Sequence, residues 1–344
     1  MKTNKKTTIQ DVANYCKVAK STVSLVINGN ARVSKATRDR IFNAIELLDY
    51  KPNLNARSLK NNRNRTLGVI SEDLANQYES SIIKGIADRA KFHNYELIIC
   101  ECEWSQEKVA NYIEVLLQRK CEGIIITTPL DIGPVLEEKL QMLKNNNIPY
   151  VTILNGNVKT DYNAFVSDDE QGLSLALDHL YQLGHTRMAL IAGYRDARAT
   201  IVKEKIFIQY MKGLGTFDPN LIHYTDFQPE GGAMATRKCL AMPMAPTAFI
   251  AAGDMIAIGI LHAVKSQGLK VPEQISIIGF GGIDLLRYTD PPLSSVNVPR
   301  RIIGEMAVEN LFKQIRKTEE KIATYTVVPT SLLLRGSTAM IGTI

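Results

Sequence analysis

The sequence predicts an α/β protein in which a small, basic three-helix module precedes a large body of two parallel-sheet subdomains. Three observations predict it: helix-period apolar residues at the start, short β-branched runs alternating with helical patterns after Thr66, and a steep charge asymmetry. With 344 residues, the chain is long enough for two or three packed units.

The charge of this chain is concentrated at one end. Residues 1–65 hold 14 Lys or Arg and 4 Asp or Glu, a balance of +10, whereas the remainder has a balance of −4. Such asymmetry indicates a module that meets a polyanion, attached to a body that does not. A basic face that is merely solvated is the alternative.

The first two helices are short and close together. Between residues 9 and 16 the apolar side chains recur at i, i+3, i+4 and i+7, and Thr8 with Asp11 predicts a loose capping box. A second apolar face covers residues 23–27 and ends at "NGN".

A third helix is expected from Ser34 to just before Pro52. Three short helices with a tight first turn form a helix-turn-helix unit, whose second helix fits the major groove of a DNA duplex. Lys20, Ser21 and Thr22, early on that helix, would face base edges and phosphates. A plain three-helix packing module is the alternative.

The stretch "TIQDVANYCKVAKSTVSLVINGNARVSKATRDRIFNAIELLDYKPNLNARSLK" closely resembles the N-terminal domain of the LacI/GalR family of bacterial transcription repressors. The resemblance implies a DNA-binding domain over residues 1–52, with a recognition helix that begins at Lys20. The DNA-contacting residues that it implies in this domain are Thr8, Lys20, Ser21, Thr22, Ser24, Leu25, Asn28 and Arg32.

Several residues depart from the family pattern in this domain. Cys16 and Lys17 replace the usual Ala-Gly of the turn, and a side chain at Lys17 costs on the order of 1 kcal/mol where the backbone is strained. Ala19 replaces the capping serine, worth roughly 1 kcal/mol. Leu25 stands where many relatives carry arginine, so guanine readout from this position is not available.

Residues 53–65 resemble the family's hinge helix, although their composition is also that of a solvated linker. The resemblance implies that the hinge becomes ordered on DNA and that Leu59 enters the minor groove and kinks the duplex. The hinge residues that it implies at the DNA are Asn53, Ala56, Arg57, Leu59 and Lys60. So short a helix needs a partner helix and DNA in order to form.

The body, residues 66–338, predicts two Rossmann-like subdomains, because it has more strands than one parallel sheet comfortably holds. We expect the first over about 66–163 and 296–328, and the second over about 164–295 and 329–338. Ligands of such sheets lie beyond the carboxyl ends of the strands.

The family resemblance continues through "DLANQY", "VSDDEQG", "LGHTRMALIAG", "GDMIAIGIL" and "PPLSSV". It implies a periplasmic-binding-protein-like core with a small-molecule effector, a sugar or related metabolite, in its cleft. Carboxylates there suit ligands rich in hydroxyl groups. The effector-binding positions that it implies are Asp73, Asn76, Tyr78, Thr127, Asp168 and Asp254.

Two charged anchors of sugar-binding relatives are missing from the pattern. In "KIFIQY" we place Ile206 at the position of an arginine, with Lys205 beside it, and "GFGG" has Gly281 and Gly282 in place of two aspartates. Either the cleft takes a less polar or differently shaped molecule, or small-molecule control has weakened. In some relatives a phosphorylated protein docks on the core, and such a co-regulator is a further alternative.

No enzyme motif is present, and we expect no cofactor, no metal and no catalytic residue. The sequence lacks G-x-x-x-x-G-K-[ST], H-E-x-x-H and G-x-S-x-G, and its five cysteines are scattered without ligand spacing. His185 is expected to be structural. The polar N-terminus "MKTNKKTTIQ" and the absence of a long apolar run favour a cytoplasmic protein with no membrane segment.

The resulting hypothesis is a homodimeric, sequence-specific regulator that binds a near-palindromic double-stranded operator, because a two-fold protein matches a two-fold site. The sequence leaves open whether dimers pair into tetramers. Two rivals from other classes are a cytoplasmic solute-binding protein without a DNA role and a sugar-processing enzyme on the same scaffold.

Overall fold

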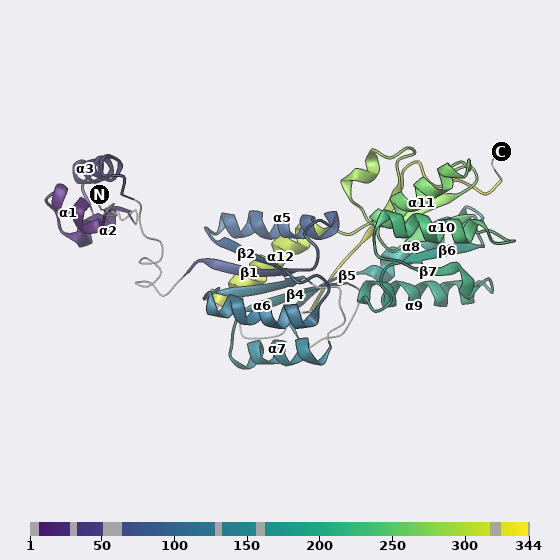
Figure 1. The fold of residues 1–344 in the computed structure, drawn as a ribbon, viewed down its shortest axis with the longest axis horizontal. Coiled ribbons are helices and arrows are strands. Elements are labelled where there is room, and N and C mark those ends of the chain that lie inside the picture. Colours follow the sequence, from purple (N-terminus) through teal and green to yellow (C-terminus); the bar gives the residue numbers. More distant parts are fainter. Residues whose placement is uncertain are drawn as a thin grey trace, which may run out of the picture. The chain divides into compact units, whose positions relative to one another are not determined.

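The computed structural model describes residues 7–27, 33–50, 64–127, 133–155, 162–316 and 325–342. The chain separates into two compact units, Met1–Asn64 and Arg65–Ile344 (Figure 1). The predicted hinge over residues 53–65 lies almost entirely outside the described residues.

Within its described residues, 7–27 and 33–50, the first unit forms three short helices around one small core. The helices are α1 (Ile9–Tyr15), α2 (Lys20–Ile27) and α3 (Lys35–Leu47). Their shared core consists of Val12, Ala13, Cys16, Val23, Val26, Ile41 and Ala44, all buried. The three predicted helices are therefore present, and they pack through the apolar faces that the sequence pattern indicated.

Local backbone chemistry sets the ends of these helices. The Thr8 backbone N–H donates to Asp11 Oδ2 at 2.8 Å, and the Asp11 N–H donates to Thr8 Oγ1 at 3.3 Å, so the expected capping box forms. Ser34 caps α3 by accepting a hydrogen bond from the Thr37 N–H. Lys17, in the turn after α1, has φ 49°, the left-handed conformation that glycine adopts without strain.

The second unit is built on two six-stranded sheets, as the sequence predicted. The first has the order β11-β5-β4-β3-β1-β2, and all of its pairs are parallel. Its strands are β1 (Thr66–Ser71), β2 (Glu96–Glu101), β3 (Gly123–Thr127), β4 (Tyr150–Asn155), β5 (Ala164–Ser167) and β11 (Tyr325–Val328).

The second sheet has the order β12-β10-β9-β8-β6-β7 and is parallel except where β12 pairs with β10. Its strands are β6 (Met188–Ala192), β7 (Ile222–Tyr224), β8 (Ala248–Ala251), β9 (Ser276–Gly281), β10 (Ser294–Asn297) and β12 (Ser331–Leu333). The chain passes between the subdomains at three described places, after β5, after β10 and after β11.

Helices cover both faces of each sheet (Figure 1). On the first sheet they are α5 (Gln77–Phe92), α6 (Gln106–Gln118), α7 (Pro134–Asn145) and α12 (Arg300–Arg316). On the second they are α8 (Asp169–Gln182), α9 (Arg198–Gly213), α10 (Pro229–Leu240) and α11 (Asp254–Ser266), with the short 3-10 turns η1 (Pro219–Leu221) and η2 (Asp284–Arg287).

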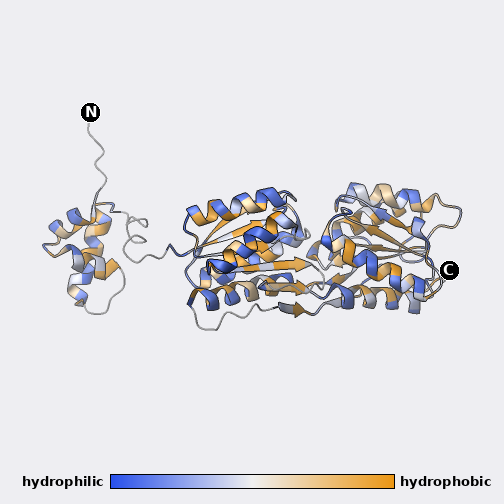
Figure 2. Ribbon diagram, turned by 90° about the horizontal axis from the view of Figure 1, so that it is seen from below, coloured by the Kyte–Doolittle hydropathy of each residue, from blue (hydrophilic) through white to orange (hydrophobic). Residues whose placement is uncertain are grey.

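Burial follows from this layering. Every residue of β3 and of β6 is buried, since helices lie on both of their faces. Figure 2 shows the strands as predominantly hydrophobic and the helices as mixed. β5 pairs within the first sheet, so the first subdomain continues to Ser167, a few residues beyond the boundary near 163 that the sequence indicates.

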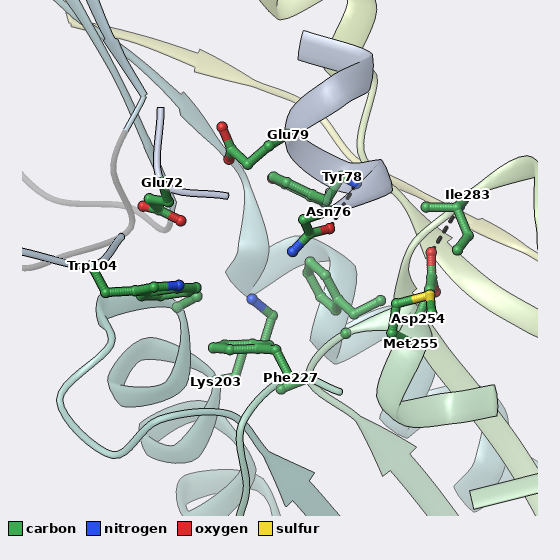
Figure 3. Close-up of a pocket in the computed structure, with 14 residues that line it drawn as sticks. Glu72, Asn76, Tyr78, Glu79, Trp104, Lys203, Phe227, Asp254, Met255 and Ile283 are labelled. Carbon is green, nitrogen blue, oxygen red and sulfur yellow. Dashed lines mark hydrogen bonds between the residues drawn. The ribbon is translucent and has the colours of Figure 1, made fainter. Parts of the chain in front are cut away.

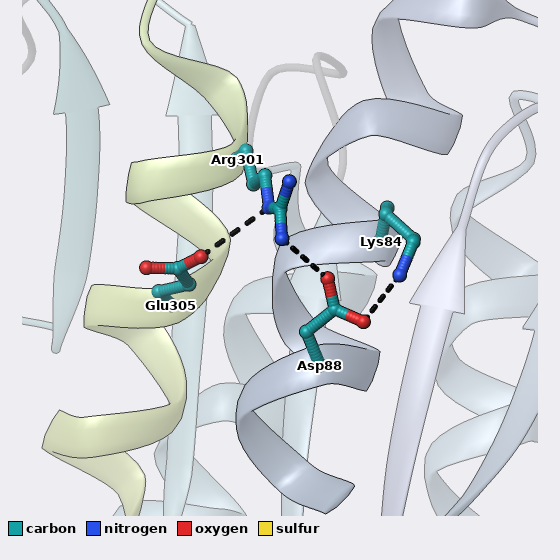
Figure 4. A network of polar contacts seen from close by, with 4 residues as sticks. All are labelled: Lys84, Asp88, Arg301 and Glu305. Atoms are coloured by element: carbon teal, nitrogen blue, oxygen red, sulfur yellow. Dashed lines mark hydrogen bonds and ion pairs between the residues drawn. The ribbon is translucent and has the colours of Figure 1, made fainter. Parts of the chain in front are cut away.

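The two helices α5 and α12 approach each other closely because each has a glycine at the contact. A Cβ at Gly85 would lie 2.1 Å from the Arg301 carbonyl oxygen, and one at Gly304 would lie 2.3 Å from the Ile82 carbonyl oxygen. A polar network flanks this contact (Figure 4): Asp88 pairs with Lys84 and, at 2.7 Å, with Arg301, which also reaches Glu305. These side chains are largely exposed, so the network adds little stability.

Candidate functional site

The helix α2 has one buried and one open face. Val23 and Val26 are buried in the core of the first unit, whereas Lys20, Ser21 and Leu25 are exposed and the side chains of Thr22 and Ser24 are partly exposed. The open face therefore carries the residues that the sequence assigned to DNA contacts on this helix. A positive charge at its first residue suits a phosphate.

The other predicted DNA-contacting residues divide into two groups. Thr8 is exposed, and its hydroxyl already donates to Asp11 Oδ2 at 2.7 Å within the capping box. The remaining predicted positions lie outside the described residues, and they are Asn28, Arg32, Asn53, Ala56, Arg57, Leu59 and Lys60.

The second unit contains a pocket between its two sheets (Figure 3). Its empty volume is about 630 Å³, a figure that includes space open to solvent. The pocket lies where β1, β2, β7, β8 and β9 end, at the carboxyl edges of both sheets. Its lining residues are Glu72, Asn76, Tyr78, Glu79, Trp104, Ala199, Lys203, Phe227, Ala252, Gly253, Asp254, Met255, Phe280 and Ile283.

Three of the six predicted effector positions line this pocket: Asn76, Tyr78 and Asp254. The Asn76 side chain also caps α5, because its Oδ1 accepts a hydrogen bond from the Tyr78 N–H at 2.9 Å. Asp254 is buried, and its oxygens accept hydrogen bonds from Ser295 Oγ at 2.6 Å and from the Ile283 N–H at 2.7 Å.

The other three predicted positions, Asp73, Thr127 and Asp168, do not line the pocket. Asp73 accepts a hydrogen bond from the Ala75 N–H in the loop after β1, and Asp168 caps α8. Thr127 contacts a pocket residue instead, because its hydroxyl donates a hydrogen bond to Glu79 Oε2 at 2.6 Å.

No histidine lines the pocket, and no group of His, Cys, Asp or Glu in the described part of the chain is arranged to hold a metal ion. His185 is buried, with Nδ1 at 2.9 Å from Thr247 Oγ1 and Nε2 at 2.9 Å from Ser276 Oγ, which fits the structural role expected for it. Within the described residues, none of the helices is both long and apolar enough to span a bilayer.

Known proteins resemble this chain over nearly its whole length. Residues 8–53 match the bacterial regulatory proteins of the lacI family, and residues 177–338 match the periplasmic binding protein-like domain. The HTH-type transcriptional repressor PurR of Vibrio atlanticus is 31% identical over 326 residues, which cover 94% of this chain and 96% of the relative. The chain belongs to the lacI family.

Two further comparisons agree with this assignment. The HTH-type transcriptional repressor CytR of Escherichia coli (strain K12) is 31% identical over 333 residues, 96% of each chain. The Lac repressor dimer bound to operator and the anti-inducer ONPF superposes with a TM-score of 0.86 at 26% identity, covering 97% of this chain and 100% of that one. This lacI-family member is thus a transcriptional regulator with a helix-turn-helix domain, and not an enzyme.

The first departure from the family pattern is the missing arginine at Ile206, on α9. Ile206 packs partly buried against the core, and Lys205 is exposed. The charged side chain that reaches the pocket is Lys203, whose Nζ lies 2.7 Å from Asp169 Oδ2. A cationic side chain therefore does reach the pocket, from a lysine three residues before Ile206, the position that the sequence pattern indicated.

The second departure is the missing aspartate at Gly281, which lies next to Asp254. Gly281 has φ 132°, and a Cβ there would lie 2.9 Å from Asp254 Oδ2. Asp254 thus occupies the space beside residue 281, and its carboxylate holds the following turn through the Ile283 N–H. A carboxylate therefore lies beside residue 281 although that residue has no side chain.

Several pocket residues were not predicted from the sequence, and they are Glu72, Glu79, Trp104, Lys203, Phe227 and Phe280. Two of them carried a detectable signal: Lys203 lies on the same helix face as Ala199 and Phe207, and Glu79 on the same face as Ile82 and Ile86. A charged residue on an otherwise apolar helix face is costly unless it has a function or a partner. The aromatic residues Trp104 and Phe227 lie in loops, where periodicity gives no signal.

Proposed function

We propose that this regulator represses transcription as a homodimer by binding a near-palindromic operator, and that a small molecule in the pocket between its two sheets controls this binding. The observation that supports it most directly is α2, whose buried valines fix the helix and whose open face presents Lys20, Ser21 and Thr22 to a duplex. The balance of +10 over residues 1–65 adds the attraction to phosphate.

The proposal extends to the hinge and to the location of the protein. Leu59, in the proposed hinge, would enter the minor groove from each subunit and bend the centre of the operator. The protein acts in the cytoplasm, where the duplex is. The Lac repressor to which this chain is similar forms a dimer that binds operator and an anti-inducer, and this likeness supports the same assembly here.

A mobility-shift assay with genomic fragments tests the proposal. Specific retardation that persists at physiological salt supports it, whereas retardation that disappears with salt for every fragment reveals polyanion attraction alone. Lys20→Ala lowers affinity and the salt slope if the side chain contacts a phosphate, and changes site preference if it reads a base. Lys238→Ala, on the exposed face of α10, is the matched control and leaves both unchanged.

A further inference from the structure

The pocket wall contains more negative than positive side chains. Three carboxylates line it, from Glu72, Glu79 and Asp254, and each of these residues is at most 4% exposed. Among the described lining residues one side chain is cationic, Lys203, which is already paired with the buried Asp169. A second buried cation, Arg300, lies behind the wall, with its guanidinium carbon 5.3 Å from the centre of the Tyr78 ring. Buried like charges repel one another strongly, because the surrounding protein screens them poorly.

Glu79 has an oxygen that the protein leaves unused. Both of its hydrogen bonds, from Thr127 Oγ1 at 2.6 Å and from Ser71 Oγ at 3.1 Å, go to Oε2. Among the described residues, Oε1 receives no hydrogen bond, although the side chain lines the pocket. A carboxylate with a free acceptor oxygen at a cavity wall is a site for a donor that arrives with a ligand.

Aromatic rings surround the same space (Figure 3). Trp104, from the first subdomain, lies nearly parallel to Phe227, from the second, with centroids 5.6 Å apart and planes 13° apart. Tyr78 lies next to Glu79 at the start of α5, and its ring also lines the pocket. Ring faces near a carboxylate attract positive charge through their quadrupoles.

The wall already holds one ammonium group in this way. Lys203 Nζ lies 4.0 Å from the centroid of the Phe280 ring and 2.7 Å from Asp169 Oδ2. Glu79 lines the same pocket as the rings of Trp104 and Phe227, so a ligand there can meet both kinds of group. Lys203 and Phe280 are therefore an internal example of the chemistry that a ligand would use.

We propose that the pocket binds a small organic cation, whose ammonium group lies between the Glu79 carboxylate and the rings of Trp104 and Phe227. The inference rests on the proposed function, since it names the ligand class of the same pocket. The cation offsets the excess of carboxylates over Lys203 and Arg300 around the pocket, and its apolar substituents contact the rings. A neutral molecule of the same shape gains only the contact with the rings.

Ionised Glu79 is the form that attracts the cation. Burial raises the pKa of Glu79 to about 7, although Thr127 and Ser71 act in the opposite direction. Cation binding therefore strengthens as the pH rises from about 6 to about 8. The charged or titratable groups around Glu79 in this part of the pocket are Glu72, Asp73, Tyr78, Cys102, Lys203, Asp254 and Arg300.

Calorimetric titration of the full chain with choline, and with its neutral isostere 3,3-dimethylbutan-1-ol, tests the ligand class. Choline is expected to bind roughly tenfold or more tightly than the alcohol. Trp104, the single tryptophan of the chain, gives an independent fluorescence readout at the site. Equal affinity for the two molecules, or no binding of choline and of tetramethylammonium, overturns the proposal.

Two variants test the assigned residues. Glu79→Gln is expected to reduce choline affinity at least tenfold and to abolish its pH dependence, with thermal unfolding as a check that it folds. Glu170→Gln, on the exposed start of α8, is the matched control and leaves the affinity unchanged. Trp104→Leu, which keeps every carboxylate, is expected to weaken choline more than the alcohol. Unchanged choline affinity in both Glu79→Gln and Trp104→Leu overturns the assignment.

A parallel mobility shift separates this inference from the proposed function. If choline binds but operator retardation does not respond to it, the cation site stands and the regulatory role of the pocket fails. If retardation responds to another metabolite while no ammonium compound binds, the regulatory role stands and the cation site fails.

Discussion

Lys203 and Asp169 form an ion pair that is almost completely buried, with Nζ 2.7 Å from Oδ2 and side-chain exposures of 3% and 1%. Asp169 also accepts a hydrogen bond from Ser167 Oγ, at the end of β5 in the first subdomain, whereas Lys203 belongs to α9 in the second. The pair thus joins α8 to α9 within the second subdomain, next to the point where the chain crosses from β5 and beside the pocket.

Breaking this pair is expected to destabilise the second unit strongly. Asp169→Asn leaves the Lys203 ammonium buried without its counter-ion, which costs about 3–5 kcal/mol of unfolding free energy. Urea unfolding followed by circular dichroism measures the loss. Lys265→Met is the control, because its partner Asp290 is exposed and an exposed pair contributes no more than about 1 kcal/mol. A loss of similar size in both variants contradicts the prediction.

The contact between Trp104 and Phe227 is expected to shield the only tryptophan of the chain. Both residues have left-handed backbone conformations, with φ 63° and 54°. Residues other than glycine rarely adopt this conformation, and strained backbones of this kind cluster at functional sites. Phe227→Ala removes the stacked ring, so acrylamide quenching of Trp104 fluorescence should increase. Phe92→Ala, at the far end of α5, is the control and leaves the quenching unchanged.

Gly281→Ala is expected to destabilise the protein by about 1–3 kcal/mol, since φ 132° strains any residue with a Cβ and the new methyl group would meet Asp254. Gly213→Ala, at the end of α9, has no atom within 4 Å of the new Cβ and is expected to be neutral or to stabilise by up to about 1 kcal/mol. Thermal unfolding of the two variants provides the comparison; a milder effect at position 281 than at 213 would be inconsistent with the strained turn.

Glu79 is expected to make stability depend on pH. Its pKa is about 7 in the folded protein against an ordinary value of 4.5, so the folded state binds more protons between these values. Unfolding free energy from this group therefore falls as pH rises from about 4.5 to 7, by up to about 3 kcal/mol. Glu79→Gln removes this contribution, so its stability relative to wild type increases with pH. A constant difference between the two proteins from about pH 5 to about pH 8 argues against burial as the cause.

Much of the fold follows from local patterns. The helix-period residues of the first unit, the Thr8–Asp11 capping box and the left-handed Lys17 all lie where the sequence indicated them. The alternating runs of the body correctly predicted two parallel sheets, because strands covered on both faces are uniformly apolar. The subdomain boundary was less accurate, since the sheet that β5 joins depends on distant strands.

The pocket was less predictable than the fold. The family resemblance predicted Asn76, Tyr78 and Asp254, which line the pocket, but it did not predict Glu79 and Lys203. Each is a charged residue on an otherwise apolar helix face, but this pattern does not tell which partner a buried charge has. Trp104 and Phe227 are 123 positions apart and come together only when the two sheets face each other.

The sequence by itself determined the helix-turn-helix head, the basic charge concentrated there and the paired α/β subdomains, because these features depend on neighbours within a few residues. Only the tertiary structure decided which charges meet at the pocket. Lys203 pairs with Asp169 and Asp254 fills the space at Gly281 because segments from both sheets converge there, and electrostatic balance inside a buried site depends on distances in space rather than along the chain.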